Sequence, residues 1–298
     1  MSEEHKGILL ESGTNELEVI VFEVGVGTFG INVMKVREII QPMDVTIMPH
    51  AHPNVEGVIR LRDEIIPVIN LAKALGFKDS KNPGQDKLIV TELNQVKAAF
   101  HVHSVSRIHR ISWEQIEKPN KLSQGLQDLT IGVIKMDENM ILLLDYEKVV
   151  YDIMPEAGLS SKKLEGIEQR DRSKKKLLIA EDSPILRQLL KDILNEAGYV
   201  QIVFTDDGKE AWTYLKEESR AEIDLLITDI EMPLMDGHHL TRKVKEDPQL
   251  KELPIIIFSS LITGDLFHKG ERVGADAQIS KPEIGKLVEE LDKLLQVE

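Results

Sequence analysis

The apolar positions follow different patterns in the two halves of the chain. Before about residue 160, they mostly alternate with polar positions in short runs, which predicts β-strands because neighbouring strand side chains point to opposite faces. The expected strands are residues 17–24, 30–40, 55–69, 87–92, 98–105 and 131–145. Many strands with little helix favour a barrel or a sandwich, since closing a sheet hides its edges. Residues 71–75 form the one helix expected here, and Gly76 is placed to end it.

Residues 25–30 spell G-x-G-x-x-G after a predicted strand, which is formally a dinucleotide-binding fingerprint. That fingerprint requires a helix to begin at the last glycine. Here the chain continues as a β-branched run, so we interpret Gly25 and Gly27 as parts of a hairpin turn.

After residue 176, short apolar runs alternate with helical patterns. The expected strands are residues 177–180, 201–205, 224–229, 254–259 and 277–280. Ser183 and Pro184 are a typical cap and first turn for the helix after the first of these strands. Five buried strands joined by helices predict a parallel, doubly wound α/β sheet.

The segment between the two patterns, residues 161–176, is polar, charged and without an apolar period. Such a composition is typical of a linker. We therefore predict a domain over residues 1–160, a charged linker over 161–176 and a second domain over 177–298, which suits a chain of 298 residues.

Polar side chains gather at the carboxyl ends of the predicted parallel strands. The residues at these ends are Glu181, Asp182, Asp229, Ser259 and Lys281. Ligands bind at this edge of such a sheet. Because three clustered carboxylates repel one another, the site calls for a hard cation, and Mg²⁺ suits carboxylates, waters and a phosphate.

A carboxylate beside such a cation can attack a phosphoryl donor and form an acyl phosphate. Lys281 would then offset charge on the transferred group, while Ser259 donates a hydrogen bond to it. The alternative is that surface acids and a stray lysine meet strand ends by chance. Five residues at the correct ends of four strands make that alternative a poor one.

The segments LLIAEDSP (177–184), ITDIEMPLMDG (227–237), PIIIFSS (254–260) and ISKP (279–282) resemble the response-regulator receiver family. The resemblance implies that Asp229 is phosphorylated and that Asp182 and Asp229 bind Mg²⁺. It further implies that Glu181 acts mainly through water and that the backbone carbonyl of Glu231 is another ligand.

The same resemblance implies a cis peptide between Lys281 and Pro282, and a Ser259 that moves toward the phosphoryl group. It also identifies Gln278 as the switch position, where receivers usually have Tyr or Phe. The readout of phosphorylation therefore departs from the family's aromatic rotation.

Composition narrows the function classes further. The chain has no cysteine, which excludes a disulfide scaffold, a thiolate metal site and a cysteine nucleophile. Its net charge is −14 and both halves are acidic, which argues against nucleic-acid binding. No apolar segment is long enough to span a bilayer, so we expect a cytoplasmic protein without direct membrane insertion.

The segment NVEGVIRLRDEIIPVINLAKALG (54–76) and the runs at 29–40 and 131–150 resemble CheW-type chemotaxis coupling domains. The resemblance implies two small five-stranded β-barrels that join chemoreceptor tips to the chemotaxis histidine kinase at membrane-associated receptor arrays. A CheW-like domain followed by a receiver domain resembles the CheV family. For the coupling surface, we predict Arg62, Val36 and Ile39, although core packing is the competing interpretation for the last two.

The leading hypothesis is a non-enzymatic chemotaxis adaptor regulated by phosphorylation of Asp229, which serves adaptation, a phosphate sink or both. The kinase would be phosphoryl donor and docking partner. Two alternatives stay open: a receiver-regulated module for a partner outside chemotaxis, and a hydrolase that forms an aspartyl-phosphate intermediate.

Overall fold

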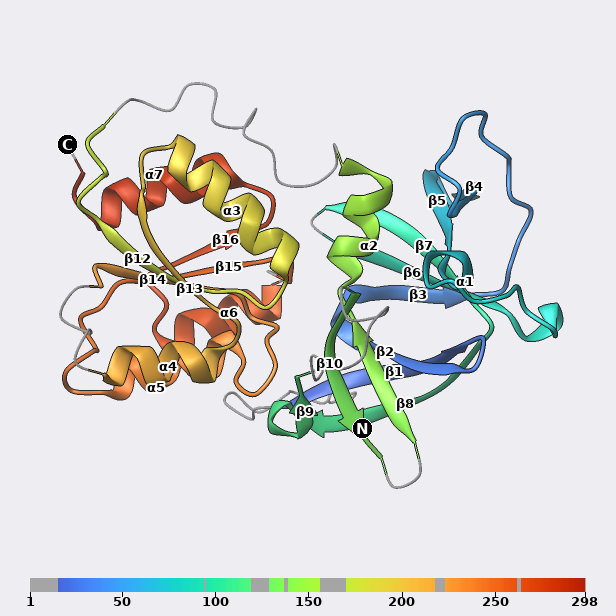
Figure 1. The fold of residues 1–298 in the computed structure, drawn as a ribbon, viewed down its shortest axis with the longest axis horizontal. Coiled ribbons are helices and arrows are strands. Elements are labelled where there is room, and N and C mark those ends of the chain that lie inside the picture. Colours follow the sequence, from blue (N-terminus) through green and yellow to red (C-terminus); the bar gives the residue numbers. More distant parts are fainter. Residues whose placement is uncertain are drawn as a thin grey trace, which may run out of the picture.

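The computed structural model describes residues 16–93, 95–118, 129–136, 139–155, 170–217, 223–261 and 264–297. They form two domains that lie side by side (Figure 1). The amino-terminal domain is mostly β, and the carboxyl-terminal domain alternates strands and helices. Both predicted fold classes are therefore confirmed. None of the helices in the described ranges combines the length and apolar composition needed to cross a membrane.

The first sheet of the amino-terminal domain has six strands in the order β8-β1-β2-β11-β10-β9. These strands are β1 (Glu16–Val24), β2 (Gly27–Asn32), β8 (Ser104–Ser112), β9 (Ile116–Glu117), β10 (Thr130–Lys135) and β11 (Met140–Leu144). The resemblance implied five strands, and the two-residue β9 adds one at the edge. Strands β1 and β2 form the expected hairpin, with Val24 opposite Gly27 and Gly25 at a φ of 62°.

The second sheet has the order β3-β6-β7-β5-β4. Its strands are β3 (Val36–Ile40), β4 (Val55–Leu61), β5 (Glu64–Asn70), β6 (Lys87–Leu93) and β7 (Val96–Val102). Helix α1 (Leu71–Ala74) follows β5 as predicted. The expected strand 30–40 is interrupted because Asn32 accepts a hydrogen bond from the Met34 amide and caps a 3-10 turn, Val33–Lys35.

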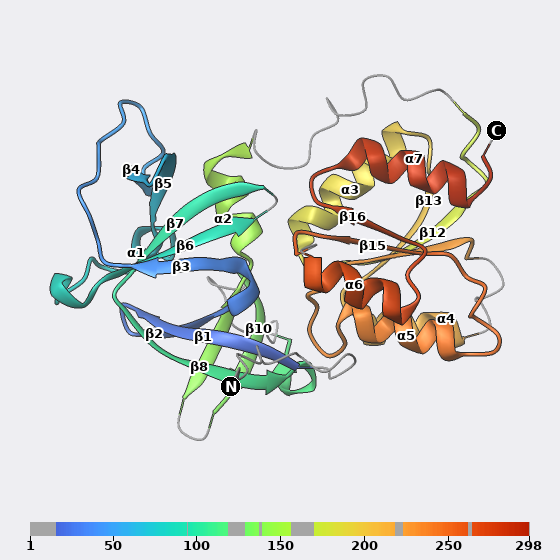
Figure 2. The same ribbon diagram turned by 180° about the vertical axis from the view of Figure 1, so that it is seen from behind.

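The expected strands 55–69 and 131–145 are each a hairpin of two strands, β4–β5 and β10–β11. Besides β9 and short 3-10 turns, strand β8 and one helix were not predicted. Strand β8 lies at the edge of its sheet and buries only Ile111, so it lacks the apolar alternation that marks a strand. Helix α2 (Tyr146–Ile153) begins at Asp145, whose side chain accepts from the Lys148 amide. In both views α2 lies on the side of its domain that faces the carboxyl-terminal domain (Figures 1 and 2).

The carboxyl-terminal domain has a fully parallel sheet in the order β13-β12-β14-β15-β16. Its strands are β12 (Lys176–Ala180), β13 (Gln201–Thr205), β14 (Leu225–Thr228), β15 (Ile255–Ser259) and β16 (Ala277–Ser280). All five agree with the predicted ranges to within a residue.

Helices α3 (Pro184–Glu196) and α7 (Ile284–Leu294) cover one face of this sheet (Figure 2). Helices α4 (Gly208–Lys216), α5 (Gly237–Glu246) and α6 (Gly264–Val273) lie on the other side. The first two helices share one aliphatic core with the strands, while α4 and α5 share another. The sheet is thus rigidly held on both faces, and its carboxyl ends meet at one edge.

The predicted linker lies largely outside the described residues, which resume at residue 170. Arg172 is buried against the carboxyl-terminal domain, where its guanidinium forms two hydrogen bonds with Asp292 at 2.6 and 2.7 Å. The domain boundary at residue 177 stays a prediction, but residue 172 already packs with the second domain.

Candidate functional site

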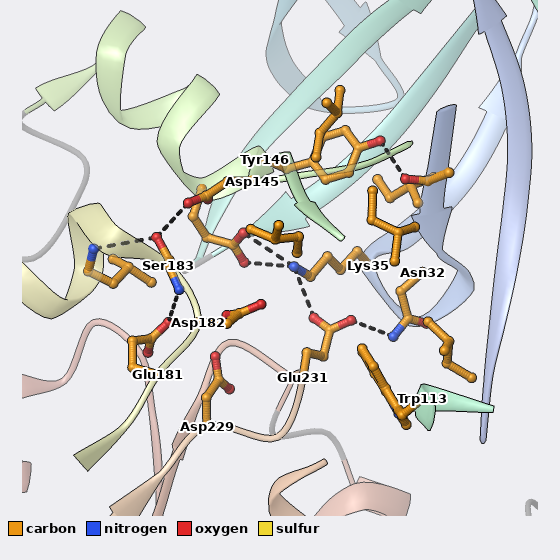
Figure 3. Close-up of a pocket in the computed structure, with 18 residues that line it drawn as sticks. Asn32, Lys35, Trp113, Asp145, Tyr146, Glu181, Asp182, Ser183, Asp229 and Glu231 are labelled. Carbon is orange, nitrogen blue, oxygen red and sulfur yellow. Dashed lines mark hydrogen bonds and ion pairs between the residues drawn. The ribbon is translucent and has the colours of Figure 1, made fainter. Parts of the chain in front are cut away.

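The acidic residues and the lysine of the predicted site meet at the carboxyl edge of the parallel sheet. Figure 3 shows the three acidic residues, Glu181, Asp182 and Asp229. Glu181 and Asp182 follow β12, Asp229 follows β14 and Lys281 follows β16. The Lys281 ammonium donates to Glu181 Oε2 and to Asp229 Oδ2, both at 2.7 Å. Asp229 also accepts from the Ile230 amide at 2.6 Å. One buried cation therefore holds two carboxylates in place.

The neighbouring turn leaves no room for a larger residue. A Cβ on Gly237 would lie 1.8 Å from the Asp229 carbonyl oxygen. The Gly237 amide donates to the Ile230 carbonyl, and the helix α5 that begins there is capped by Asp236. A glycine at the start of α5 thus lets this helix pack directly under Asp229.

The donor set fits a divalent cation. One oxygen each from Glu181, Asp182 and Asp229 lies within 4.8 Å of the others. Among the described residues, Asp182 Oδ2 is buried and has no hydrogen-bond partner. A buried carboxylate oxygen without a partner is costly. A hard cation with oxygen ligands supplies the missing interaction, and this is the observation that favours a metal here.

Burial and mutual repulsion change the ionisation of this cluster. Burial raises the pKa of Glu181 to about 7, although Lys281 opposes the change. Burial also holds the pKa of Asp182 well above its usual range, and the charges of Glu181 and Asp229 add to that effect. Burial alone would lower the pKa of Lys281, but Asp229 and Glu181 raise it beyond its usual value.

Stability without divalent cations is expected to fall as the pH rises from about 5 to about 8. Glu181 loses its proton near its usual pKa of 4.5 when unfolded but near 7 when folded, so the folded protein binds more protons between these values. We expect a loss of about 1 to 3 kcal/mol in the free energy of unfolding, measured by urea titration. Mg²⁺ should restore part of it at the higher pH only.

The control for this measurement is Glu181→Gln, which has no titrating group at that position and should reduce the pH dependence, while Asp182, whose pKa is also raised, contributes the remainder. A free energy of unfolding that rises with pH in the metal-free protein would contradict the assignment of raised pKa values to this cluster.

The remaining predicted receiver residues lie near the acidic cluster with different contacts. Ser259 is fully buried, and its hydroxyl accepts from the Leu261 amide at 3.3 Å. The bond between Lys281 and Pro282 is cis. Gln278 points toward α6: its Nε2 donates to the Phe267 carbonyl at 2.7 Å, and a Cβ on Gly270 would lie 2.1 Å from its Oε1. Gln278 is thus part of the contact with α6.

Glu231 directs its side chain away from the carboxylate cluster and into the other domain (Figure 3). Its Oε2 lies 2.9 Å from the Lys35 ammonium, and its Oε1 accepts from Asn32. Lys35 also contacts Glu147, at 2.9 and 3.2 Å. Burial alone would lower the pKa of Lys35. The nearby charges of Glu147 and Glu231 outweigh that effect and hold the pKa of Lys35 well above its usual value.

Sequence reasoning missed Lys35, Asp145 and Glu147 as neighbours of the acidic site. The Ser183 hydroxyl donates to Asp145 Oδ2 at 2.6 Å, so the residue that caps α3 is also bound by the other domain. These residues give no sequence signal of a contact between domains. Lys35 is a single lysine in a strand-like run, and Asp145 and Glu147 are two acids at the start of a helix.

The residues predicted for the coupling surface lie in the second sheet or in its β4–β5 turn, and none of them lines the cavity at the acidic cluster. Val36 is half-buried and packs against the hydrophobic core that lies between the two sheets of the CheW-like domain, whereas Ile39 is 39% exposed. Arg62 lies in the β4–β5 turn with a φ of 57°, and its side chain contacts Glu38 at 3.1 Å. Core packing therefore accounts for part of the environment of Val36, while Ile39 and Arg62 are accessible.

Comparison with known proteins agrees with the two folds. A family model of the CheW-like domain matches residues 18–154, and one of the response regulator receiver domain matches residues 177–292. Chemotaxis protein CheV3 of Helicobacter pylori is 32% identical over 301 residues, which cover 94% of this chain and 95% of that protein. The chain belongs to the CheV family of chemotaxis proteins.

Two further similarities cover the CheW-like domain alone. Chemotaxis protein CheW of Thermotoga maritima is 32% identical over 150 residues, which cover 50% of this CheV-family chain and 98% of that protein. The scaffolding protein TtCheW of Thermoanaerobacter tengcongensis is 27% identical, with a TM-score of 0.41 over 43% of this chain and 88% of that one.

Proposed function

We propose that this protein is a chemotaxis adaptor. Its CheW-like domain couples chemoreceptor tips to the chemotaxis histidine kinase, and Mg²⁺-dependent phosphorylation of Asp229 in the receiver domain regulates that coupling. The kinase is both docking partner and phosphoryl donor in this proposal. The output is adaptation of the receptor signal, a sink for phosphoryl groups, or both, at the cytoplasmic face of receptor arrays.

The observation that carries the proposal is the arrangement of Lys281 between Glu181 and Asp229, beside the unpartnered oxygen of Asp182. One carboxylate oxygen of Asp229 accepts a hydrogen bond from the Lys281 ammonium and the other accepts one from the Ile230 amide. These two bonds orient the carboxylate. Lys281 would stabilise negative charge that develops on a transferred phosphoryl group. Glu181, Asp182, Asp229 and the Glu231 carbonyl would hold Mg²⁺, which would neutralise further phosphoryl charge when bound.

Coupling would use the second sheet of the CheW-like domain. Ile39 is exposed there, and Arg62 projects from a neighbouring turn with 75% of its side chain accessible. An exposed aliphatic residue beside an arginine is a common basis for a protein contact. Val36 contributes through its position in β3 beside this surface.

The protein is expected to take up one phosphoryl group when incubated with acetyl phosphate and Mg²⁺, detected as a mass increase of the intact chain. Asp229→Ala should abolish the increase, because this carboxylate is the proposed nucleophile. Omitting Mg²⁺ should slow it by about tenfold or more, since the phosphoryl charge then lacks its main counterion.

The matched control is Asp224→Ala. Asp224 directly precedes β14, at the opposite end of that strand from Asp229, and its side chain accepts a hydrogen bond from the Lys176 amide. This variant should be phosphorylated like the wild type. A mass increase that persists in Asp229→Ala would place the modification elsewhere and overturn the assignment.

Two other functions make different predictions. A hydrolase would need an acid/base group two residues after Asp229, and that residue, Glu231, is instead paired with Lys35. Sustained turnover of phosphate esters would support the hydrolase, and we expect none. A partner outside chemotaxis would be favoured if a chemoreceptor tip fails to retain this protein while it retains a separate CheW protein.

A further inference from the structure

The proposed phosphorylation site lies under the CheW-like domain. The cavity around it is lined by Glu181, Asp182 and Asp229 of the receiver domain and by Lys35, Asp145 and Glu147 of the CheW-like domain. Its volume is about 30 Å³. Figure 3 shows side chains of both domains converging on this space.

This volume limits what the cavity can hold. A buried water needs about 10 to 15 Å³ of such space, so the cavity has room for about two waters. A phosphoryl group adds a phosphorus and three oxygens to Asp229, which is more than that space admits. A bare cation could fit among the carboxylates, but the phosphoryl group could not join it with the domains in this arrangement.

Charge opposes the phosphoryl group as well. Six carboxyl-bearing residues line the cavity against a single lysine, Lys35. The positive charge of Lys35 already faces two glutamates, Glu147 and Glu231, at 2.9 Å. A phosphoryl group would add about 1.5 to 2 further negative charges.

The contacts between the domains are specific and mostly buried. The Lys35 and Glu231 side chains are 8% and 10% exposed, and the Ser183–Asp145 hydrogen bond is buried. The domains also meet where Lys118 lies 2.7 Å from Asp207 and where the Leu234 amide donates to the Trp113 carbonyl at 3.1 Å. Such contacts hold a defined docked arrangement.

We propose that the phosphorylation face of the receiver is the docking surface for the CheW-like domain of the same chain, and that docking and phosphorylation of Asp229 exclude each other. This inference rests on the proposed function and adds its regulation. The docked protein accepts a phosphoryl group only after the domains separate, and phosphorylation keeps them apart. Because such coupling is reciprocal, a partner that binds only the separated CheW-like domain also promotes phosphorylation.

Two measurements on the full chain test this inference. The chain has no cysteine, so Val26→Cys and Glu252→Cys introduce two unique labelling positions, one in each domain. Val26 is 97% exposed and the Glu252 side chain is 90% exposed, so labels there should not disturb packing. Spin labels at these positions should move apart when acetyl phosphate and Mg²⁺ are added, and should not in an Asp229→Ala background.

The second measurement is the initial rate of phosphorylation by acetyl phosphate with Mg²⁺. Lys35→Met leaves Glu147 and Glu231 facing each other, so the domains should separate and the rate should rise about fivefold or more. Lys118→Met removes an interface contact of a 39% exposed side chain and should raise the rate by a smaller factor without affecting folding. Lys135→Met, whose lysine pairs with Glu117 within its own domain, is the control and should leave the rate unchanged.

The possible outcomes separate the inference from the proposed function. Equal rates in the wild type, Lys35→Met and Lys118→Met, with a constant label distance, overturn the inference and leave the proposed function intact. Absence of phosphorylation in the wild type and in all variants overturns the proposed function, and the inference with it.

Discussion

Replacing Lys281 with methionine is expected to lower the free energy of unfolding by about 3 to 5 kcal/mol near pH 8 without Mg²⁺. Lys281 is 1% exposed and is bound to both Glu181 and Asp229. Its removal leaves two carboxylates buried beside Asp182 without their cation. Phosphorylation by acetyl phosphate should be lost as well, because nothing else among the described residues places a positive charge on Asp229.

The pH dependence distinguishes this mechanism from a loss of packing. Near pH 5 the buried Glu181, whose pKa burial raises to about 7, takes up a proton, so the loss caused by Lys281→Met should shrink markedly. Urea titrations at both pH values, with Lys286→Met as control, measure the difference. Lys286 is exposed and paired only with Glu283, so that control should change the free energy by less than about 1 kcal/mol. A loss that is equal at both pH values would argue for packing alone.

Arg172→Met is expected to destabilise the receiver domain by about 3 to 5 kcal/mol, although Arg172 is not part of the acidic cluster. Arg172 is 2% exposed and forms a bidentate pair with Asp292. Asp292 also accepts from the Tyr199 hydroxyl at 2.9 Å, and Arg172 donates to the Ala197 carbonyl at 2.9 Å. Removing the Arg172 guanidinium leaves the buried Asp292 carboxylate with the Tyr199 hydroxyl as hydrogen-bond donor and with the Arg170 guanidinium 3.8 Å away.

Urea unfolding followed by Trp212 fluorescence in a Trp113→Phe background reports on the receiver domain, since the chain has two tryptophans. Arg170→Met is the matched control: Arg170 is 33% exposed and lies 3.8 Å from Asp292. It should cost about 1 kcal/mol or less. Equal effects of the two variants would show that the bidentate pair contributes no more to the free energy of unfolding than the more exposed arginine does.

The receiver fold and its acidic cluster were predictable because local patterns specify both. Apolar runs such as residues 177–180 mark buried parallel strands, and the residues after them must meet at one edge of the sheet. Ser183 and Pro184 mark the start of α3, where the structure has it. The positions of Asp229 and Lys281 follow from strand ends alone.

The contacts between the domains could not be predicted in this way. Lys35 and Glu231 are 196 positions apart and meet only because two complete domains dock. The short helix α2 was not predicted because its apolar residues continue the pattern of the preceding strand, and its capping residue, Asp145, is the last residue of the expected strand 131–145. Arg172 looked like a linker residue because its partner, Asp292, is 120 positions away. Periodicity carries no information on such pairings.

Helix α2 gives the CheW-like domain a mechanical connection to the receiver. Tyr146, Val149 and Val150 lie in a core that includes strands of both sheets, and the Tyr146 hydroxyl donates to the Gly30 carbonyl at 2.9 Å. Asp145 and Glu147, at the start of the same helix, contact Ser183 and Lys35. A close-packed interior transmits strain. A shift at the start of α2 therefore requires the side chains of the core beneath the helix to move as well. The rates of amide hydrogen exchange in α2 and in the strands that it covers should therefore change together when the receiver domain separates from the CheW-like domain.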